Sequence, residues 1–375
     1  MRGIAMRRFG FFIALICSLI VASCSNSEFY SDEEIKWTWI PYDSDLLRIS
    51  GRSFEQDDHV VLSWSATSVT IAFVGTSLEA KIGTNRDLLL DVLVDGNVEV
   101  SAAYEITYAD GNPVTIPIVS DLPYGEHVVT LYKKSEGFVG DWYFYGVRVF
   151  GRIPKDIVPE PAERKIEFIG NSITCGCDVV APGFGLAFDP VNEDSYYSYA
   201  GQMGRILGAE IHTICYSGHG VYINVDGSKD ELLPIAYERS GFFSTAPNWN
   251  HESWHPDAIV IGLGTNDYAS NENDSAQFVN AMIAFVQKLR SYHPAAKIVL
   301  LDGPMLTGLY MEECRRALDA AKQTLENQGL NGIYRFSFEP RGDSPSYLYF
   351  HPTKIEALED ATRMSAWMRS EFGWD

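Results

Sequence analysis

Short apolar runs alternate with helix-forming segments through the second half of this 375-residue chain. The runs lie at 165–169, 210–215, 258–263, 297–301 and 333–336. A strand that is buried on both faces of a sheet is apolar along its length, and helices between such strands are typical of a parallel sheet. We therefore predict an α/β domain over 165–375, with a doubly wound parallel sheet flanked by helices.

Two of the intervening segments have the period of an amphipathic helix. Phe278, Met282, Phe285 and Leu289 recur every three or four residues, which places them on one helical face. A second helix is expected over 311–328, where Gly329 would end it because glycine readily adopts the left-handed conformation.

The first half of the chain has a different pattern, with short runs that alternate in polarity or are β-branched. They lie at 69–74, 88–94, 114–119 and 127–132. Asp95-Gly96-Asn97 and Asp110-Gly111-Asn112 are typical of hairpin turns. We predict an all-β, jelly-roll-like sandwich over 37–151. Three prolines among charged residues then predict a linker over 152–164.

The acidic composition limits the kinds of partner that this chain can bind. Its formal net charge is −21, and the acidic residues are scattered rather than grouped. Binding of nucleic acid needs a basic surface, so we predict no nucleic-acid partner and expect a neutral substrate.

The first residues resemble an export signal. Three arginines lie among the first eight residues, and the apolar stretch 9–22 that follows is too short to span a membrane comfortably. The stretch ends in Val21-Ala22-Ser23-Cys24, which resembles a bacterial lipobox. That resemblance implies that Cys24 is lipidated and becomes the mature N-terminus.

We accordingly expect a lipoprotein signal peptide over 1–23 and a polar tether over 24–36. The protein would be an exported lipoprotein of the bacterial cell envelope, at the outer membrane and facing the periplasm or the cell exterior. Its contact with the membrane would be through the lipid anchor only. An ordinary signal peptide that is cleaved nearby is the alternative.

Four cysteines belong to the expected mature fold, and their spacing does not match a zinc site. Cys175 and Cys177 are too close in sequence for a relaxed bridge to each other, which favours buried free thiols. Pairing of either residue with Cys215 stays open in an exported protein. Cys314 is the fourth.

Four short motifs follow the predicted strands or precede the last predicted helix. They are Gly170-Asn171-Ser172-Ile173-Thr174, Ser217-Gly218-His219-Gly220, Gly264-Thr265-Asn266-Asp267 and Phe350-His351-Pro352. Ligands of an open α/β sheet bind beyond the carboxyl ends of its strands, where these loops meet. Cleavage through an acyl-serine needs a nucleophile, a base and oxyanion donors, which Ser172, His351, Gly218 and Asn266 can supply. Each motif alone is explained by a cap or a turn, but their joint order predicts catalysis.

The first motif resembles the first block of the SGNH (GDSL-type) hydrolases, with Asn171 in place of the usual aspartate. The other three motifs match the remaining blocks. With a β-sandwich ahead of such a domain, the chain resembles carbohydrate esterase family 2. The resemblance implies an acetyl xylan esterase-like enzyme that removes O-acetyl groups from xylan or glucomannan. We expect that no metal or organic cofactor is needed. The alternatives are an SGNH lipase or thioesterase with a wider acyl pocket, and an inactive glycan-binding surface protein.

The resemblance also implies specific roles. The backbone N–H groups of Ser172 and Gly218 and the side-chain amide of Asn266 would hold the oxyanion. SGNH enzymes commonly have an aspartate three residues before the histidine, but Leu348 occupies that position here. We therefore expect a Ser172–His351 dyad and leave open which group orients the histidine; a backbone carbonyl near Leu348 is one candidate. Asp343 is a less suitable substitute, because eight residues is an awkward reach.

His251-Glu252-Ser253-Trp254-His255 matches the H-E-x-x-H pattern of zinc proteases. That pattern binds zinc only on a helix, and Pro256 and the strand predicted from residue 258 follow it directly, so we expect no zinc there. Instead, Trp249 and Trp254 are expected beside the catalytic face, where an aromatic plane can stack on a sugar. Phe350, next to the predicted base, is a further candidate for substrate binding.

Overall fold

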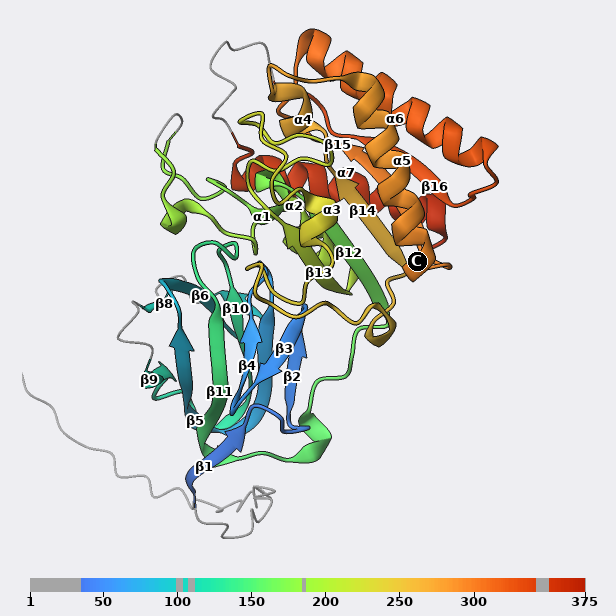
Figure 1. Ribbon diagram of the computed structural model, residues 1–375. Helices are drawn as coiled ribbons and strands as arrows, with labels where there is room; N and C mark the ends of the chain where they lie inside the picture. The colour runs from blue at the N-terminus through green and yellow to red at the C-terminus, as the bar shows by residue number, and fades with distance from the viewer. Residues whose placement is uncertain (1–34, 99–103, 107–111, 184–186, 342–350, 375) are drawn as a thin grey trace, which may run out of the picture. The chain divides into compact units, whose positions relative to one another are not determined.

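The structure is a computed structural model that describes residues 35–98, 104–106, 112–183, 187–341 and 351–374 (Figure 1). Antiparallel strands form its first part, and a parallel sheet with helices forms the second. Within the described ranges, no helix is both long and apolar enough to cross a lipid bilayer.

The first part is the all-β sandwich that the sequence predicts, and all of its strand pairs are antiparallel. Its strands are β1 (Lys36–Pro41), β2 (Leu47–Ser50), β3 (Ser53–Gln56), β4 (His59–Leu62), β5 (Ser68–Thr84), β6 (Leu88–Val94), β7 (Asn97–Val98), β8 (Tyr104–Ile106), β9 (Val114–Val119), β10 (Gly125–Lys133) and β11 (Trp142–Arg152). The predicted turn at Asp95 joins β6 to β7. The predicted turn at Asp110-Gly111 lies outside the described residues.

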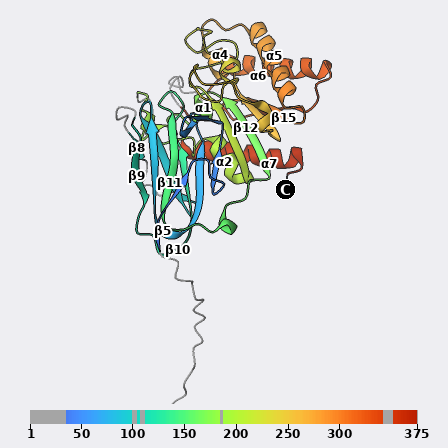
Figure 2. The ribbon, with the colours of Figure 1, turned by 60° about the horizontal axis from the view of Figure 1, so that its bottom comes forward.

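Strand β5 exchanges its partners halfway along its 17 residues. Its first half pairs with β2 and β10, and its second half pairs mainly with β9 and β11. Figure 2 shows β5 among the long strands of this part, with β9, β10 and β11 also labelled. The exchange occurs near Gly75, where a Cβ atom would lie 2.3 Å from the carbonyl oxygen of Phe150. Only glycine allows the two backbones to approach so closely. Gly75 therefore lets one long strand pair with different partners along its two halves.

The second part is the predicted parallel sheet, with the strand order β13-β12-β14-β15-β16. Its strands are β12 (Arg164–Gly170), β13 (Ala209–Cys215), β14 (Ala258–Gly262), β15 (Lys297–Asp302) and β16 (Ile333–Ser337). The apolar runs of the sequence are these strands, with small differences at their ends. Successive side chains face opposite sides: Ile259 joins one core cluster, and Val260 joins another.

Helices cover both faces of this sheet (Figure 1). Core residues of α5 (Ser275–Tyr292) and α6 (Gly308–Asn327) pack on one face, and those of α2 (Tyr199–Leu207) and α7 (Lys354–Phe372) pack on the other. The four apolar residues predicted to form one helical face are buried on α5. Helix α6 starts three residues before the prediction, and Gly329 follows its end with a φ of +87°.

A buried ion pair links the two parts of the chain. Arg52, between β2 and β3, has no exposed side-chain surface, and its Nη2 lies 2.9 Å from Oε1 of Glu167 on β12. The hydroxyl of Tyr237 donates to the other oxygen of Glu167 at 2.7 Å, and its ring lies 4.3 Å from the Arg52 guanidinium. Each buried charge therefore has partners, which its removal from water requires.

Replacing Arg52 by Ala should lower the free energy of unfolding by roughly 3–5 kcal/mol, because Glu167 would stay buried without its counter-charge. Urea unfolding of the purified protein measures this loss. Arg148→Ala is the matched control, since Arg148 pairs with Glu79 at the surface and should contribute about 1 kcal/mol or less. Equal losses in the two variants would contradict this account.

Candidate active site

Hydrogen bonding of the parallel strands aligns three of the four motifs. Gly170, at the end of β12, pairs in register with Cys215 of β13 and with Gly262 of β14. The residues after these three ends therefore lie next to one another. They are Ser172 in α1 (Ser172–Cys175), the loop that contains Gly218, and Asn266 in α4 (Thr265–Ala269).

Ser172 is the first residue of α1 and is nearly buried, with 8% of its surface exposed. The side chain of Asn171 caps this helix by accepting a hydrogen bond from the Ile173 N–H at 3.1 Å. The helix ends after one turn at Gly176, which has a φ of +85°. The sequence thus folds into a tight turn that presents Ser172 at a helix start.

The loop with Gly218, which follows β13, is held by the motif that follows β14, two strands away in the sheet. The side-chain nitrogen of Asn266 donates to the carbonyl of His219 at 2.8 Å. Asp267 accepts hydrogen bonds from the backbone N–H groups of three successive residues, Val221, Tyr222 and Ile223. Burial raises the pKa of Asp267 to about 6, although these hydrogen bonds lower it. An amide has two N–H bonds, so Asn266 keeps a second donor beside the one given to His219.

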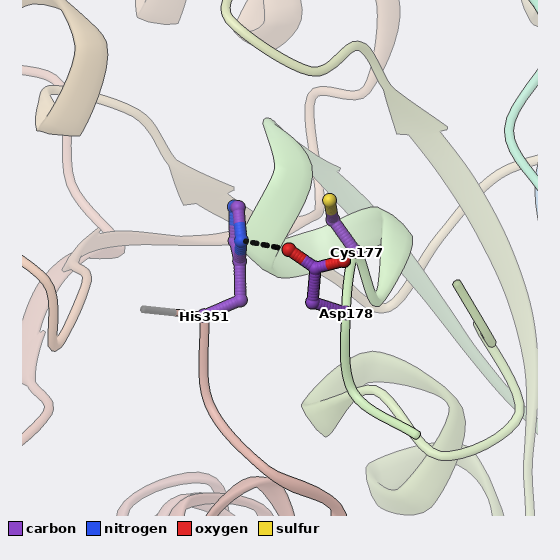
Figure 3. Close-up of side chains that lie close together, drawn as sticks. All are labelled: Cys177, Asp178 and His351. Carbon is purple, nitrogen blue, oxygen red and sulfur yellow. Dashed lines mark hydrogen bonds and ion pairs between the residues drawn. The ribbon is translucent and has the colours of Figure 1, made fainter. Parts of the chain in front are cut away.

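His351 contacts a carboxylate that the sequence analysis missed. Its Nδ1 lies 3.2 Å from Oδ2 of Asp178, which is six residues after Ser172 (Figure 3). The N–H of Lys354 donates to the carbonyl of Val179 at 2.9 Å and ties the two loops together. A carboxylate at Nδ1 keeps the proton on that nitrogen, which leaves Nε2 free to accept one.

Asp178 is thus a hydrogen-bond partner of His351, a part for which sequence analysis considered a backbone carbonyl near Leu348. Leu348 and Asp343, which that analysis considered, lie outside the described residues. One signal was present, because Asp178 is the first acidic residue after Ser172. That position alone does not identify Asp178 as the partner of His351, because the two residues are 173 positions apart in sequence.

The cysteines near Ser172 are in two states. Cys175, at the end of α1, forms a disulfide with Cys215 at the end of β13. Cys177 and Cys314 are free and buried. The expectation of free thiols is thus wrong for Cys175 and correct for Cys177, and the open pairing with Cys215 is made by Cys175. The disulfide ties the turn of Ser172 to the neighbouring strand.

Two groups of side chains among the described residues have ligand atoms close enough for a metal ion. One contains Cys177, Asp178 and His351. Its thiol is a poor ligand, because burial raises the pKa of Cys177 far above its ordinary value. The other contains Glu136, Glu193 and Cys175, whose sulfur is already in the disulfide.

The H-E-x-x-H segment contributes to neither group. It forms the 3-10 helix η3 (His251–Ser253), so His255 lies outside that short helix. The ring of His251 stacks on Tyr292 at 4.0 Å, and His255 is 54% exposed at its side chain. Two imidazoles on one α-helical face, which the zinc-protease pattern needs, are therefore not formed here.

The two tryptophans are not where the sequence placed them. Trp254 is buried, stacks on His212 of β13 at 3.6 Å, and donates its indole N–H to Glu210 near the start of that strand. Trp249 also contacts His212 and lies 5.3 Å from the Arg52 guanidinium. Because Ser172 lies beyond the opposite, carboxyl end of the sheet, neither ring is beside it. Phe350 and Cys24 lie outside the described residues.

Comparison with known proteins gives two matching family models. Carbohydrate esterase 2 N-terminal matches residues 49–154, and the GDSL-like Lipase/Acylhydrolase family matches residues 168–354. The first model covers most of the sandwich, and the second includes Ser172, Gly218, Asn266, Asp178 and His351.

Two curated relatives have esterase names. Cellulase/esterase CelE of Acetivibrio thermocellus is 31% identical over 83% of this chain, but the chain spans only 38% of that relative's length. An acetylxylan esterase / glucomannan deacetylase of Cellvibrio japonicus is 26% identical over 88% of this chain and 89% of the relative.

Solved structures share the whole two-part architecture. A family two carbohydrate esterase from Clostridium thermocellum, in complex with cellohexaose, has a TM-score of 0.81 and 29% identity and covers 88% of this chain and 100% of its own. A family two carbohydrate esterase from Cellvibrio japonicus also has a TM-score of 0.81, with 25% identity over 90% of this chain and 99% of its own.

Replacing Asp178 by Asn should slow the reaction of Ser172 with a fluorophosphonate by roughly 10²- to 10⁴-fold, because the amide favours the wrong tautomer of His351. The rate of covalent labelling, followed by mass spectrometry, measures this effect. Asp189→Asn is the matched control, since Asp189 lies between α1 and α2 and its side chain accepts a hydrogen bond from the Val191 N–H, not from His351. An Asp178→Asn rate equal to that of the control would rule out the orienting role.

Proposed function

We propose that this chain, which belongs to carbohydrate esterase family 2, removes O-acetyl groups from plant polysaccharides such as acetylated xylan or glucomannan. One observation carries the proposal. The parallel sheet aligns a serine at a helix start with two loops of candidate oxyanion donors, and a carboxylate six residues from that serine orients His351.

The first half of the proposed reaction forms an acetyl-enzyme. Nε2 of His351 takes the proton of the Ser172 hydroxyl, and the serine oxygen attacks the acetyl carbonyl. The N–H groups of Ser172 and Gly218 and the free N–H of Asn266 stabilise the oxyanion. Asp178 stabilises the imidazolium that forms, because it accepts the hydrogen bond from Nδ1.

The second half releases the products. Protonated His351 gives its proton to the sugar oxygen as the carbon–oxygen bond breaks, so a free sugar hydroxyl leaves. Water then attacks the acetyl-serine while His351 takes its proton. His351 returns that proton to the serine oxygen as the acyl bond breaks, which leaves acetate and the free Ser172 hydroxyl.

The net charge and the relatives support a carbohydrate substrate. A neutral polysaccharide is compatible with a chain of net charge −21, whereas an anionic one would be repelled. One relative is named as a glucomannan deacetylase, and the solved relative holds cellohexaose. The chain spans only 38% of CelE, so the cellulase activity in that protein's name carries no argument about this chain.

Wild-type protein should release acetate from acetylated xylan and acetylated glucomannan, and Ser172→Ala should lose this activity because the nucleophile is absent. Acetate release at a fixed protein concentration measures the difference. Release of the free fatty acid from a butyrate or octanoate ester, at the same protein concentration, tests acyl-chain preference.

Faster turnover of the long acyl esters would contradict deacetylation and support a lipase with a wider acyl pocket. Equal inactivity of the wild type and Ser172→Ala on every ester, with glycan binding retained, would show a binding protein instead. Equal melting temperatures of the two proteins would confirm that a loss of activity is chemical.

We further propose that the protein is exported and anchored by a lipid on Cys24. The basic start, the short apolar stretch and the lipobox-like end of the first 24 residues support this proposal. Cys24→Ala should abolish incorporation of labelled palmitate in a bacterial host and move the protein from the membrane fraction to the soluble fraction. Unchanged membrane association of the variant would exclude the anchor.

A further inference from the structure

A buried carboxylate of the sandwich part reaches the loop that contains Gly218. Glu136 lies between β10 and β11 and has no exposed surface. Its Oε2 accepts the backbone N–H of Ser217 at 2.9 Å, and its Oε1 accepts the Ser217 hydroxyl. Ser217 directly precedes Gly218, so the sandwich holds the residue next to a proposed oxyanion donor.

Glu136 is itself held firmly. Its backbone N–H donates to Oε1 of Glu193 at 2.7 Å. The fully buried Lys133 donates to the carbonyls of Ser135 at 2.7 Å and of Glu136 at 3.2 Å. These bonds fix the backbone on both sides of the Cα atom. The side chain therefore reaches Ser217 from a fixed position.

Every polar group of Ser217 has a partner. Glu136 accepts its N–H and hydroxyl, and Nδ1 of His219 donates to its carbonyl at 2.8 Å. Burial lowers the pKa of His219, which favours the neutral ring. This ring also stacks on Tyr216 at 3.4 Å between centroids.

The direction of the Gly218 N–H follows from these contacts. The Ser217 carbonyl and the Gly218 N–H belong to one planar trans peptide and point in opposite directions. Fixing the carbonyl on His219 and the preceding N–H on Glu136 therefore fixes where the Gly218 N–H points. Oxyanion donors are effective because they are oriented before the charge develops, so this restraint bears directly on catalysis.

We propose that Glu136 is a positioning residue for catalysis, through which the β-sandwich orients the oxyanion donor Gly218. The inference rests on the function proposed above and gives the sandwich a part in the chemistry. Burial of an acid is costly, and it raises the pKa of Glu136 to about 7. A purely apolar contact would join the two parts without that cost.

A matched set of variants separates positioning from general stability. Glu136→Ala removes both acceptors of Ser217. Glu136→Gln keeps an oxygen for the Ser217 N–H and an amide donor for its hydroxyl. Asp141→Ala is the control, because Asp141 is a buried acid of the same connection that bonds Ser63 and Asn85, not Ser217. Ser217→Ala removes one of the two bonds without touching Glu136.

The readouts are kcat and KM for 4-nitrophenyl acetate, the rate of fluorophosphonate labelling of Ser172, and the melting temperature. Glu136→Ala should lower kcat and the labelling rate by roughly 10- to 100-fold with KM little changed, because an oxyanion donor acts mainly in the transition state. Glu136→Gln should recover most of the loss. Asp141→Ala should lower the melting temperature but keep kcat. Ser217→Ala should show a smaller kcat loss, and it tests the contact if Glu136→Ala does not fold.

Wild-type kcat in Glu136→Ala or Ser217→Ala would overturn the inference while the proposed function stood. Equal kcat losses in Glu136→Ala and Asp141→Ala, or no recovery in Glu136→Gln, would also overturn it. A wild type that is labelled at Ser172 but releases no acetate would instead contradict the proposed substrate. In that case the labelling rates of the variants would still test the positioning role.

Discussion

The register of three parallel strands is the constraint on which the candidate site depends. Backbone hydrogen bonds place the ends of β12, β13 and β14 opposite one another. Residues that are about fifty positions apart in sequence then begin their loops at the same edge of the sheet. Strand pairing alone therefore brings together the loops that contain Ser172, Gly218 and Asn266. Side-chain bonds such as that from Asn266 to His219 only refine a position that the sheet has set.

His351 reaches this edge by a different route. It precedes α7 rather than following a strand, so strand register does not place it. Its position depends on the Asp178 carboxylate and on the backbone bond between Lys354 and Val179. Asp178 lies on the chain that leaves the short helix of Ser172. One segment thus supplies both the nucleophile and the group that orients its base.

Buried charges join the sandwich to the parallel sheet. Arg52 pairs with Glu167 of β12, and Glu136 accepts hydrogen bonds from Ser217 next to Gly218. A charged group away from water is tolerated only where its bonds are satisfied, so these contacts demand a specific placement of the two parts. An apolar interface would constrain the relative placement of the two parts less, because hydrophobic contact has little directionality.

The sequence by itself determined the two-part fold and the order of the motifs, because apolar periodicity and turn residues are local properties that each segment carries alone. It misplaced Trp254 and could not show that Asp178 meets His351, that Cys175 pairs with Cys215, or that Glu136 meets Ser217. These contacts join residues at least 40 positions apart. Only the tertiary structure decided these contacts. The partner of a side chain depends on how elements distant in sequence pack together, and the local spacing of residues does not determine that packing.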